Sequence, residues 1–258
     1  MAAKPTVIVI FLILMFVLEG LFPHQRGRQQ RMRHAVPHVL TAVLNAILSR
    51  LFLAGITVHV IGRADAHSLG LVRSVDLGPL VRIIIVLVLF DGWMYCWHLA
   101  NHRIAFLWRF HRAHHADIDM DTTTALRFHP GELILSTVIR LPVVVLIGMS
   151  VAELAVFETM LNVSTLFHHS NLALAEKWDR LLRVVVVTPN MHRVHHSAEP
   201  AEMNSNFTSL LSFWDRLART FSMREDTRGI VFGLPVFREE RFQRLRGFLI
   251  TPFIRRTT

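Results

Sequence analysis

Residues 133–167, LILSTVIRLPVVVLIGMSVAELAVFETMLNVSTLF, determine the expected architecture, because they form an apolar run of 35 residues. As one helix this run would be about 52 Å long, too long for a single passage through a hydrocarbon core of about 30 Å. We therefore predict two shorter helices that break near residues 148–150 and form a hairpin entering and leaving the membrane on one side. Pro142 is expected to kink the first helix, and Glu153 and Glu158 are expected to face the protein interior or the interface.

Three further apolar segments precede this hairpin. They cover residues 6–22, 36–61 and 77–99, and each is close to the length of a membrane span. A cleaved signal peptide is the alternative for the first segment, but it lacks a cleavage site of small residues. In the third segment, Arg82 is expected to reach the headgroups, whereas Asp91 shares a helical face with His98.

The composition of the whole chain agrees with a membrane protein. Of its 258 residues, 52% are hydrophobic and 18% are charged, which excludes a disordered chain and disfavours an ordinary soluble domain. The formal net charge of +9 comes mostly from Arg residues that flank apolar runs, so nucleic-acid binding is the weaker interpretation. The single cysteine, Cys96, permits no internal disulfide.

The distribution of Arg residues predicts the orientation in the membrane. The loop after the first segment contains four of them, Arg26, Arg28, Arg31 and Arg33, which favours a cytoplasmic position for this loop. Counting spans from there puts the segments after residue 99 and from residue 169 onward on the same side. We thus expect an all-α, multi-pass transmembrane helical bundle with a cytoplasmic histidine-rich cap, in a bacterial inner membrane.

The histidines are clustered, since 11 of the 16 lie between His98 and His196. Eight of them form three local patterns: His98 and His102; His111, His114 and His115; and His192, His195 and His196. Spacings of three and four residues place imidazoles on one face of a helix, an arrangement suited to several ligands converging on a metal ion. Eight imidazoles exceed the coordination number of one ion, so we predict a dimetal centre in the cap.

Ligand type alone leaves the metal open among Fe, Zn, Cu and Ni. A structural zinc site is disfavoured because such sites favour Cys ligands, and a zincin because the sequence contains no His-Glu-x-x-His. Other functions stay open as well. They are a membrane metal-binding or metal-transport protein without oxygenase activity, a bis-histidine haem carrier, and a catalytically inactive scaffold that keeps the metal for folding.

Over residues 91–220 the sequence resembles the fatty acid hydroxylase superfamily, and within it the sterol desaturase branch. The three histidine boxes come in the family's order as WHLANH (97–102), LWRFHRAHH (107–115) and TPNMHRVHH (188–196), with TALRFHPGE (124–132) and FHHSN (167–171) between the second and third. In the last segment the family match falls on His169, so His168 is interpreted as incidental. Members of this family are integral membrane oxygenases.

The resemblance implies a di-iron centre that uses O2 and two electrons to hydroxylate or desaturate a C–H bond of a lipid, sterol-like or other hydrophobic substrate. The implied iron ligands are His98, His102, His111, His114, His115, His192, His195 and His196, with His169 as a ninth. His129 is either a tenth ligand or a group beside the ligands. The electrons would come from a separate ferredoxin, rubredoxin or cytochrome b5 type donor with its reductase.

Several residues are expected to lie next to the ligands: Asp91, Glu132, Asn171, Asn204 and Asp215. The acidic residues Asp117, Asp119 and Asp121 are interpreted as a solvated loop. The segments 204–208 and 213–220 resemble the family's sequence after the third box but lack its glycines, which affects the expected geometry of this loop.

The chain divides into N-terminal spans at 1–99, an overlapping catalytic domain at 91–220 that includes the hairpin, and a tail at 221–258. Trp-Asp-Arg-Leu occurs twice, at 178–181 and 214–217, which we interpret as coincidence because there is no wider repeat. The histidines outside the boxes are expected to have interfacial or surface roles; they are His24, His34, His38, His59 and His67.

Overall fold

The structure is a computed structural model that describes residues 3–26 and 30–255; Arg28 of the predicted cytoplasmic loop lies outside this part. Six long helices form the body of the molecule: α1 (Ala3–Leu21), α2 (Arg31–Leu48), α3 (Ala54–Ala66), α4 (Pro79–Arg103), α6 (Pro130–Ile147) and α7 (Val151–His169). The described residues contain no strand beyond three isolated bridges. The predicted all-α class is therefore confirmed.

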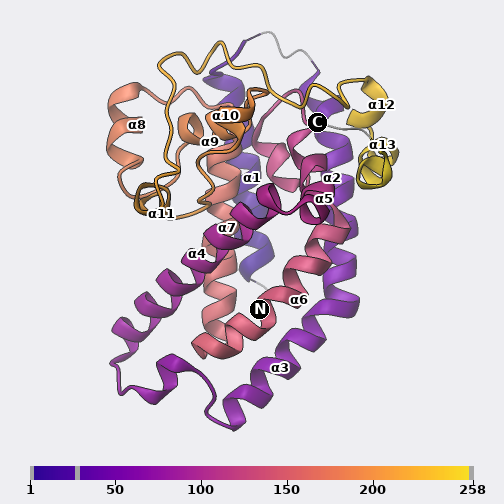
Figure 1. The fold of residues 1–258 in the computed structure, drawn as a ribbon. Helices are drawn as coiled ribbons and strands as arrows, with labels where there is room; N and C mark the ends of the chain where they lie inside the picture. Colours follow the sequence, from indigo (N-terminus) through magenta and orange to yellow (C-terminus); the bar gives the residue numbers. More distant parts are fainter. Residues whose placement is uncertain (1–2, 27–29, 256–258) are drawn as a thin grey trace.

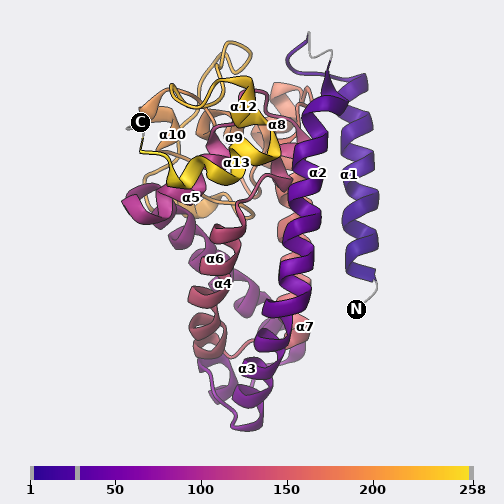
Figure 2. The same ribbon diagram turned by 90° about the vertical axis from the view of Figure 1, so that its right-hand side faces the viewer.

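The long helices run between a cap of short elements at one end and tight turns at the other (Figures 1 and 2). The cap contains α5 (Ala105–His115), α8 (Glu176–Leu182), α9 (Pro189–His195), α10 (Pro200–Met203), α11 (Phe213–Leu217), α12 (Glu240–Gln243) and α13 (Leu245–Ile250). Chain order explains this layout, because α4 leads up into the cap, α6 leaves it, and α7 returns to it (Figure 1).

Three helical segments are long and apolar enough to cross a membrane: Arg31–Ser74, Pro79–Arg103 and Pro130–Ile147. The first of these is one nearly continuous run, in which a π-helical turn at Ser49–Leu53 joins α2 to α3. The N-terminal segment forms a shorter apolar helix, Pro5–Leu21. The length and hydropathy of these helices indicate a membrane protein.

Residues 133–167 form two helices, as predicted, and the break lies within the expected segment. Helix α6 ends at Gly148, whose φ of 88° is a left-handed conformation that glycine adopts without steric cost. Ser150 then begins α7, where its side chain and that of Glu153 form a capping box. Gly70 packs so closely here that an added Cβ would lie 2.2 Å from the Cα of Gly148.

Two pairs of oppositely charged side chains join α7 to the neighbouring helices α4 and α6. At the turn between α6 and α7, Arg82 donates to both carboxylate oxygens of Glu153, at 2.8 and 3.1 Å. Arg82 is thus held by a carboxylate of α7, and its reach toward headgroups stays a prediction. Arg140 of α6 pairs with Glu158 of α7 at 2.8 Å. Both glutamates of the hairpin thus face a partner within the protein, as predicted.

Candidate metal centre

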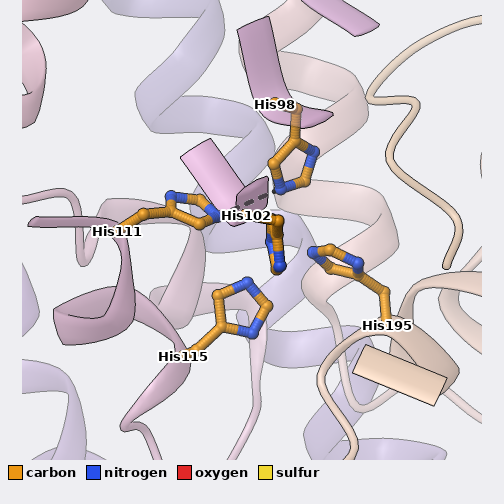
Figure 3. Close-up of side chains that lie close together, drawn as sticks. All are labelled: His98, His102, His111, His115 and His195. Carbon is orange, nitrogen blue, oxygen red and sulfur yellow. Dashed lines mark hydrogen bonds between the residues drawn. The ribbon is translucent and has the colours of Figure 1, made fainter. Parts of the chain in front are cut away.

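Five histidines from three helices converge on one point, and we call them the first group: His98, His102, His111, His115 and His195. The last two turns of α4 supply His98 and His102, and α5 supplies His111 and His115 on one face. His195 comes from α9. One ring nitrogen from each of the five lies within 4.8 Å of the others, and Figure 3 shows the rings pointing toward a common centre.

A second group of four histidines lies beside the first: His114, His169, His192 and His196. Their ligand atoms are also within 4.8 Å of one another. The rings of His115 and His196, one from each group, stack with centroids 4.4 Å apart. The nine histidines that the sequence pattern and the family resemblance indicated are therefore brought together, in two sets.

Five of these rings are held by their Nδ1 atoms. In each case Nδ1 donates to a backbone carbonyl or a carboxylate: His98 to Phe207 O, His114 to Arg127 O, His169 to Thr165 O, His195 to Ser205 O, and His111 to Glu132 Oε1, at 2.6–3.2 Å. Such a bond fixes the tautomer and the orientation of a metal-ligating imidazole. The Nε2 atom of each ring is then left with its lone pair.

These lone pairs face one another, which tests whether the residues fit a metal. The Nε2 atoms of His98 and His111 are 3.1 Å apart, and so are those of His114 and His169. Two neutral imidazoles that already donate from Nδ1 have no proton to share across this gap, so their lone pairs repel. A cation bound by both removes the repulsion, and ligands about 2.1 Å from one ion lie about 3 Å apart when adjacent. The residues therefore fit metal ions.

Burial keeps these histidines in the form that binds metal. Desolvation lowers the pKa of His195 to about 3, and desolvation together with neighbouring imidazoles holds the pKa values of His115 and His196 well below the ordinary 6.5. All three are neutral at pH 7. Within the described chain, buried Nε2 atoms of His102, His195 and His196 have no hydrogen-bond partner. Such atoms are costly unless a ligand satisfies them.

Two of the predicted carboxylates support ligands. Glu132 binds His111 directly, at 2.8 Å. Asp215 acts indirectly on His98. It accepts hydrogen bonds from the backbone N–H groups of Phe207 and Thr208. The carbonyl of Phe207 in turn accepts a hydrogen bond from His98. Both carboxylates lie beside the histidine groups, where negative charge would favour a bound cation.

The other three residues expected near the ligands have different partners. Asp91 accepts from the backbone of Leu211 and from Trp214 Nε1, which attaches the cap to α4. Asn171 exchanges hydrogen bonds with Gln25 at the end of α1. Asn204 caps its own short helix by donating to the Pro200 carbonyl.

His129 and His168 lie outside both groups. His129 accepts from Gly131 N through Nδ1 and donates to the Leu249 carbonyl through Nε2, so both ring nitrogens are engaged. His168 was interpreted as incidental, yet it is buried, its ring centroid lies 4.0 Å from that of His192, and neither nitrogen finds a partner among the described residues. The family match to His169 therefore selected the member of this pair that lies in the second group, but the sequence did not indicate that His168 is buried beside His192.

The loop after the third box, residues 204–220, adopts a defined conformation although it lacks the glycines of the family. Arg219, which stands where the family has glycine, adopts a left-handed conformation with φ of 60°. Asn206 is also left-handed, with φ of 54°, and its side chain is fixed by Met191 O and Ser222 O. The loop therefore keeps its position through side-chain hydrogen bonds and accepts some backbone strain.

A third group was missed by sequence reasoning: His34, His38 and Asp117, with Asp121 and Arg127 beside them. His34 contacts Asp117 at 2.8 Å and Asp121 at 2.9 Å through its two ring nitrogens. Both carboxylates are fully buried, so their interpretation as a solvated loop was wrong. His34 and His38 are likewise not surface residues. Burial alone would raise the pKa of Asp117, but His34 and His38 outweigh it and hold that pKa well below 3.8.

A cavity of about 340 Å³ reaches both metal groups. It contacts His98 and His111 of the first group and three histidines of the second, His114, His169 and His192. From there it extends between α6 and α7 to Arg140, with apolar walls that include Met94, Leu133 and Leu161. An apolar cavity that ends at two histidine groups suits a hydrophobic molecule whose reacting carbon lies next to bound metals.

Comparison with known sequences identifies the class of protein that this fold and site define. The profile of the family described as fatty acid hydroxylase matches residues 83–220, which contain both histidine groups. The chain belongs to the fatty acid hydroxylase family. No solved structure matches the chain.

Among curated proteins, the chain is 29% identical to alkylglycerol monooxygenase of Danio rerio over 147 residues, covering 56% of this chain and 31% of the relative. It is 30% identical to the ornithine lipid hydroxylase OlsE of Rhizobium tropici over 143 residues, covering 54% of this chain and 41% of the relative. The chain therefore matches well under half the length of either relative. By their names, one of these relatives is a monooxygenase and the other a lipid hydroxylase.

Proposed function

We propose that this protein is a membrane-bound di-iron oxygenase that hydroxylates a C–H bond of a lipid or another hydrophobic molecule. The observation that carries the proposal is the pair of buried histidine groups, five and four residues, at the end of an apolar cavity. Two iron ions held there would supply the activation of O2, and the balanced reaction inserts one oxygen atom into C–H and reduces the other to water with two electrons and two protons.

Residues of the chain orient the metal ligands, exclude water and supply negative charge. The Nδ1 hydrogen bonds hold the imidazoles in place, so that little reorganisation is needed when metal binds. The cavity walls exclude water and align an apolar chain toward His98 and His114. Glu132 and Asp215 add negative charge on the side of the first group.

Hydroxylation is preferred over desaturation because the named relatives are a monooxygenase and a hydroxylase. We further propose that the electrons come from a separate donor of the ferredoxin, rubredoxin or cytochrome b5 type with its reductase. We also propose that the cap lies on the cytoplasmic side; the cluster of Arg residues between the end of α1 and the first turn of α2 supports this orientation.

Metal transport is the second candidate that the sequence left open. A transporter needs ligands spaced along a path through the bilayer. The nine histidines instead form compact, buried groups at one end of the helices, and five of them are immobilised by Nδ1 hydrogen bonds. This arrangement favours a resident metal centre over a path for ions.

The test is metal analysis of the detergent-purified protein, followed by reduction and exposure to O2 with host lipids under mass spectrometry. We expect two irons per chain and a lipid that gains one oxygen atom. The double variant His111→Ala, His192→Ala should lose both, whereas His59→Ala, at an exposed histidine of α3, should behave as the parent. Folded parent protein without bound metal would contradict the proposal, and a lipid that loses two hydrogens would identify a desaturase.

A further inference from the structure

An exposed apolar surface lies on the cap at α8 and α11, and neither histidine group includes a residue from it. We call it the α8–α11 surface; its apolar side chains are Leu181, Leu182, Val184, Val185, Phe213 and Leu217. The exposed fractions of Leu181, Val184 and Leu217 are 61%, 61% and 72%. Apolar side chains gathered in this way usually mark a contact with a partner or a membrane.

The two elements of this surface are fixed to each other. Ser212 N donates to Val185 O at 3.0 Å, and Val186 and Leu211 form an antiparallel bridge. The two Trp-Asp-Arg-Leu segments, 178–181 and 214–217, both lie here, and each buries its aspartate while exposing its arginine and leucine. The repeated tetrapeptide therefore builds one surface with a basic and an apolar side chain at equivalent positions.

The α8–α11 surface continues the lipid-facing side of a candidate span. Trp214 donates to Asp91 Oδ2 at 3.0 Å, and its ring packs so closely on Gly92 that an added Cβ would lie 2.8 Å from it. Asp91 is about 10 Å along α4 from His98, toward the end far from the cap. Figure 1 shows α11 at the lower edge of the cap near the upper part of α4, with α8 above it on the outer side of the cap. Farther from the cap, Ile84 and Leu89 of α4 are also exposed.

The charged side chains around the surface are mostly basic. Within residues 176–185 and 212–219, the exposed acidic side chain is Glu176, and the exposed basic side chains are Lys177, Arg180, Arg216 and Arg219. Trp178 is half exposed among them. Trp and Arg next to apolar side chains are typical of the membrane–water interface, where basic residues meet anionic headgroups.

We propose that the α8–α11 surface lies in the membrane–water interface, with its apolar side chains among acyl chains and its basic side chains at anionic headgroups. The inference does not depend on the metal or on the reaction. It gives the cap a second attachment to the bilayer, beside the spanning helices. A second copy of the chain or an electron-donor protein on this surface is the competing occupant, and the experiment distinguishes them.

The test uses single-cysteine variants in a Cys96→Ser background, reconstituted into phosphatidylcholine vesicles with and without phosphatidylglycerol. Nitroxide labels at Val185→Cys and Leu217→Cys report collisions with O2, which is enriched in lipid, and with a water-soluble nickel complex. Ile84→Cys on α4 is the lipid control, and Val231→Cys, 59% exposed elsewhere on the cap, is the aqueous control. We expect O2-to-nickel ratios at 185 and 217 that are several-fold above the ratio at 231 and approach that at 84.

Ratios at 185 and 217 equal to the aqueous control would overturn the proposal. Labels shielded from both reagents would also overturn it, because they would indicate a protein on this surface. The charge contribution is tested by Lys177→Glu with Arg180→Glu, which should reduce the increase in the ratio caused by phosphatidylglycerol. An increase that is unchanged by both substitutions would overturn the role of these two basic side chains.

Discussion

The two metal groups and the third group are both clusters of buried histidines at the same end of the helical bundle, yet they differ in how the ring nitrogens are used. In the metal groups, Nδ1 atoms donate to the protein and Nε2 lone pairs face one another. In the third group, both nitrogens of His34 contact carboxylates, while His38 contacts Thr123 and Arg127. The facing lone pairs of the first two groups can bind cations. In the third group, the positive charge comes from the protein itself, in His34 and Arg127, and is paired with carboxylates.

This difference shows that proximity of ligand types does not define a metal site. His34, His38 and Asp117 lie as close together as the ligands of the metal groups. Because a charged His34 donating from both nitrogens has no lone pair left, this group acts as an ion-pair network. The network also supports the second metal group, since the backbone carbonyl of Arg127 accepts from His114.

The largest effect is expected for His114→Ala. The second group then keeps three histidines, so we expect loss of its iron and of oxygenase activity, with normal membrane insertion. Metal analysis and lipid mass spectrometry measure both. His168→Ala is the matched control, because His168 is equally buried but lies outside both groups. Unchanged iron content in His114→Ala would refute its role as a ligand.

His34→Gln, in contrast, should lower the stability of the fold and leave iron binding intact. It removes the cation between Asp117 and Asp121, leaving two buried carboxylates without their partner, at a cost of about 3–5 kcal/mol in the free energy of unfolding. Thermal unfolding should shift strongly downward, while protein kept folded at low temperature still binds two irons. A variant with parental stability but no iron would reverse our assignment of the two kinds of cluster.

Replacing Glu132 by Ala should weaken metal binding at the first group about 10–100-fold, because His111 loses the carboxylate that orients it. Glu132→Gln keeps an acceptor at this position and should have a smaller effect. Titration with a competing chelator measures both affinities. Equal affinity in parent and Glu132→Ala would show that the hydrogen bond is dispensable.

Acid should release the metal before it breaks the third group. Since the folded pKa of His195 is about 3 against 6.5 when unfolded, the folded state binds fewer protons, and the stability this provides above pH 6.5 is lost progressively as pH falls toward 3. Protons also compete with metal for the same nitrogens. The contribution of Asp117, whose pKa is held below 3.8, is lost only in stronger acid. Iron content and far-UV circular dichroism followed from pH 7 to 3 test this order; simultaneous loss would contradict it.

The smallest effect is expected for Arg219→Gly, which removes a side chain from a backbone position with φ of 60°. Relief of the left-handed strain should raise the free energy of unfolding by about 1 kcal/mol and leave iron content unchanged. A lower unfolding temperature would mean that Arg219 makes a contact that outweighs this strain.

Local patterns in the sequence predicted the break between α6 and α7 and the histidines of the two groups. That residues 133–167 must break follows from their length as a membrane helix, and the position of the break follows from Gly148 and Ser150. The histidine boxes are visible because ligands on one helical turn recur at spacings of three and four residues. In both cases the information lies within a few turns of chain.

Long-range pairing could not be predicted in the same way. The burial of Asp117 depends on His34, which lies 83 residues away, and that of Glu19 depends on Arg31 and on the backbone of Thr122 and Asn171. A carboxylate that is paired in the folded chain has the same local sequence as a solvated one. The division of nine histidines into sets of five and four likewise depends on how α9 docks against α4 and α5.

That division has a consequence for how the protein is made. The first group takes four histidines from before the hairpin and one, His195, from after it, whereas the second takes one, His114, from before and three from after. Neither set can be complete until the ribosome has synthesised the chain past residue 196 and the hairpin has been inserted. Metal loading is therefore a late step of biogenesis, and a chain truncated between α7 and α9 would reach the membrane with ligands that belong to two unfinished sites.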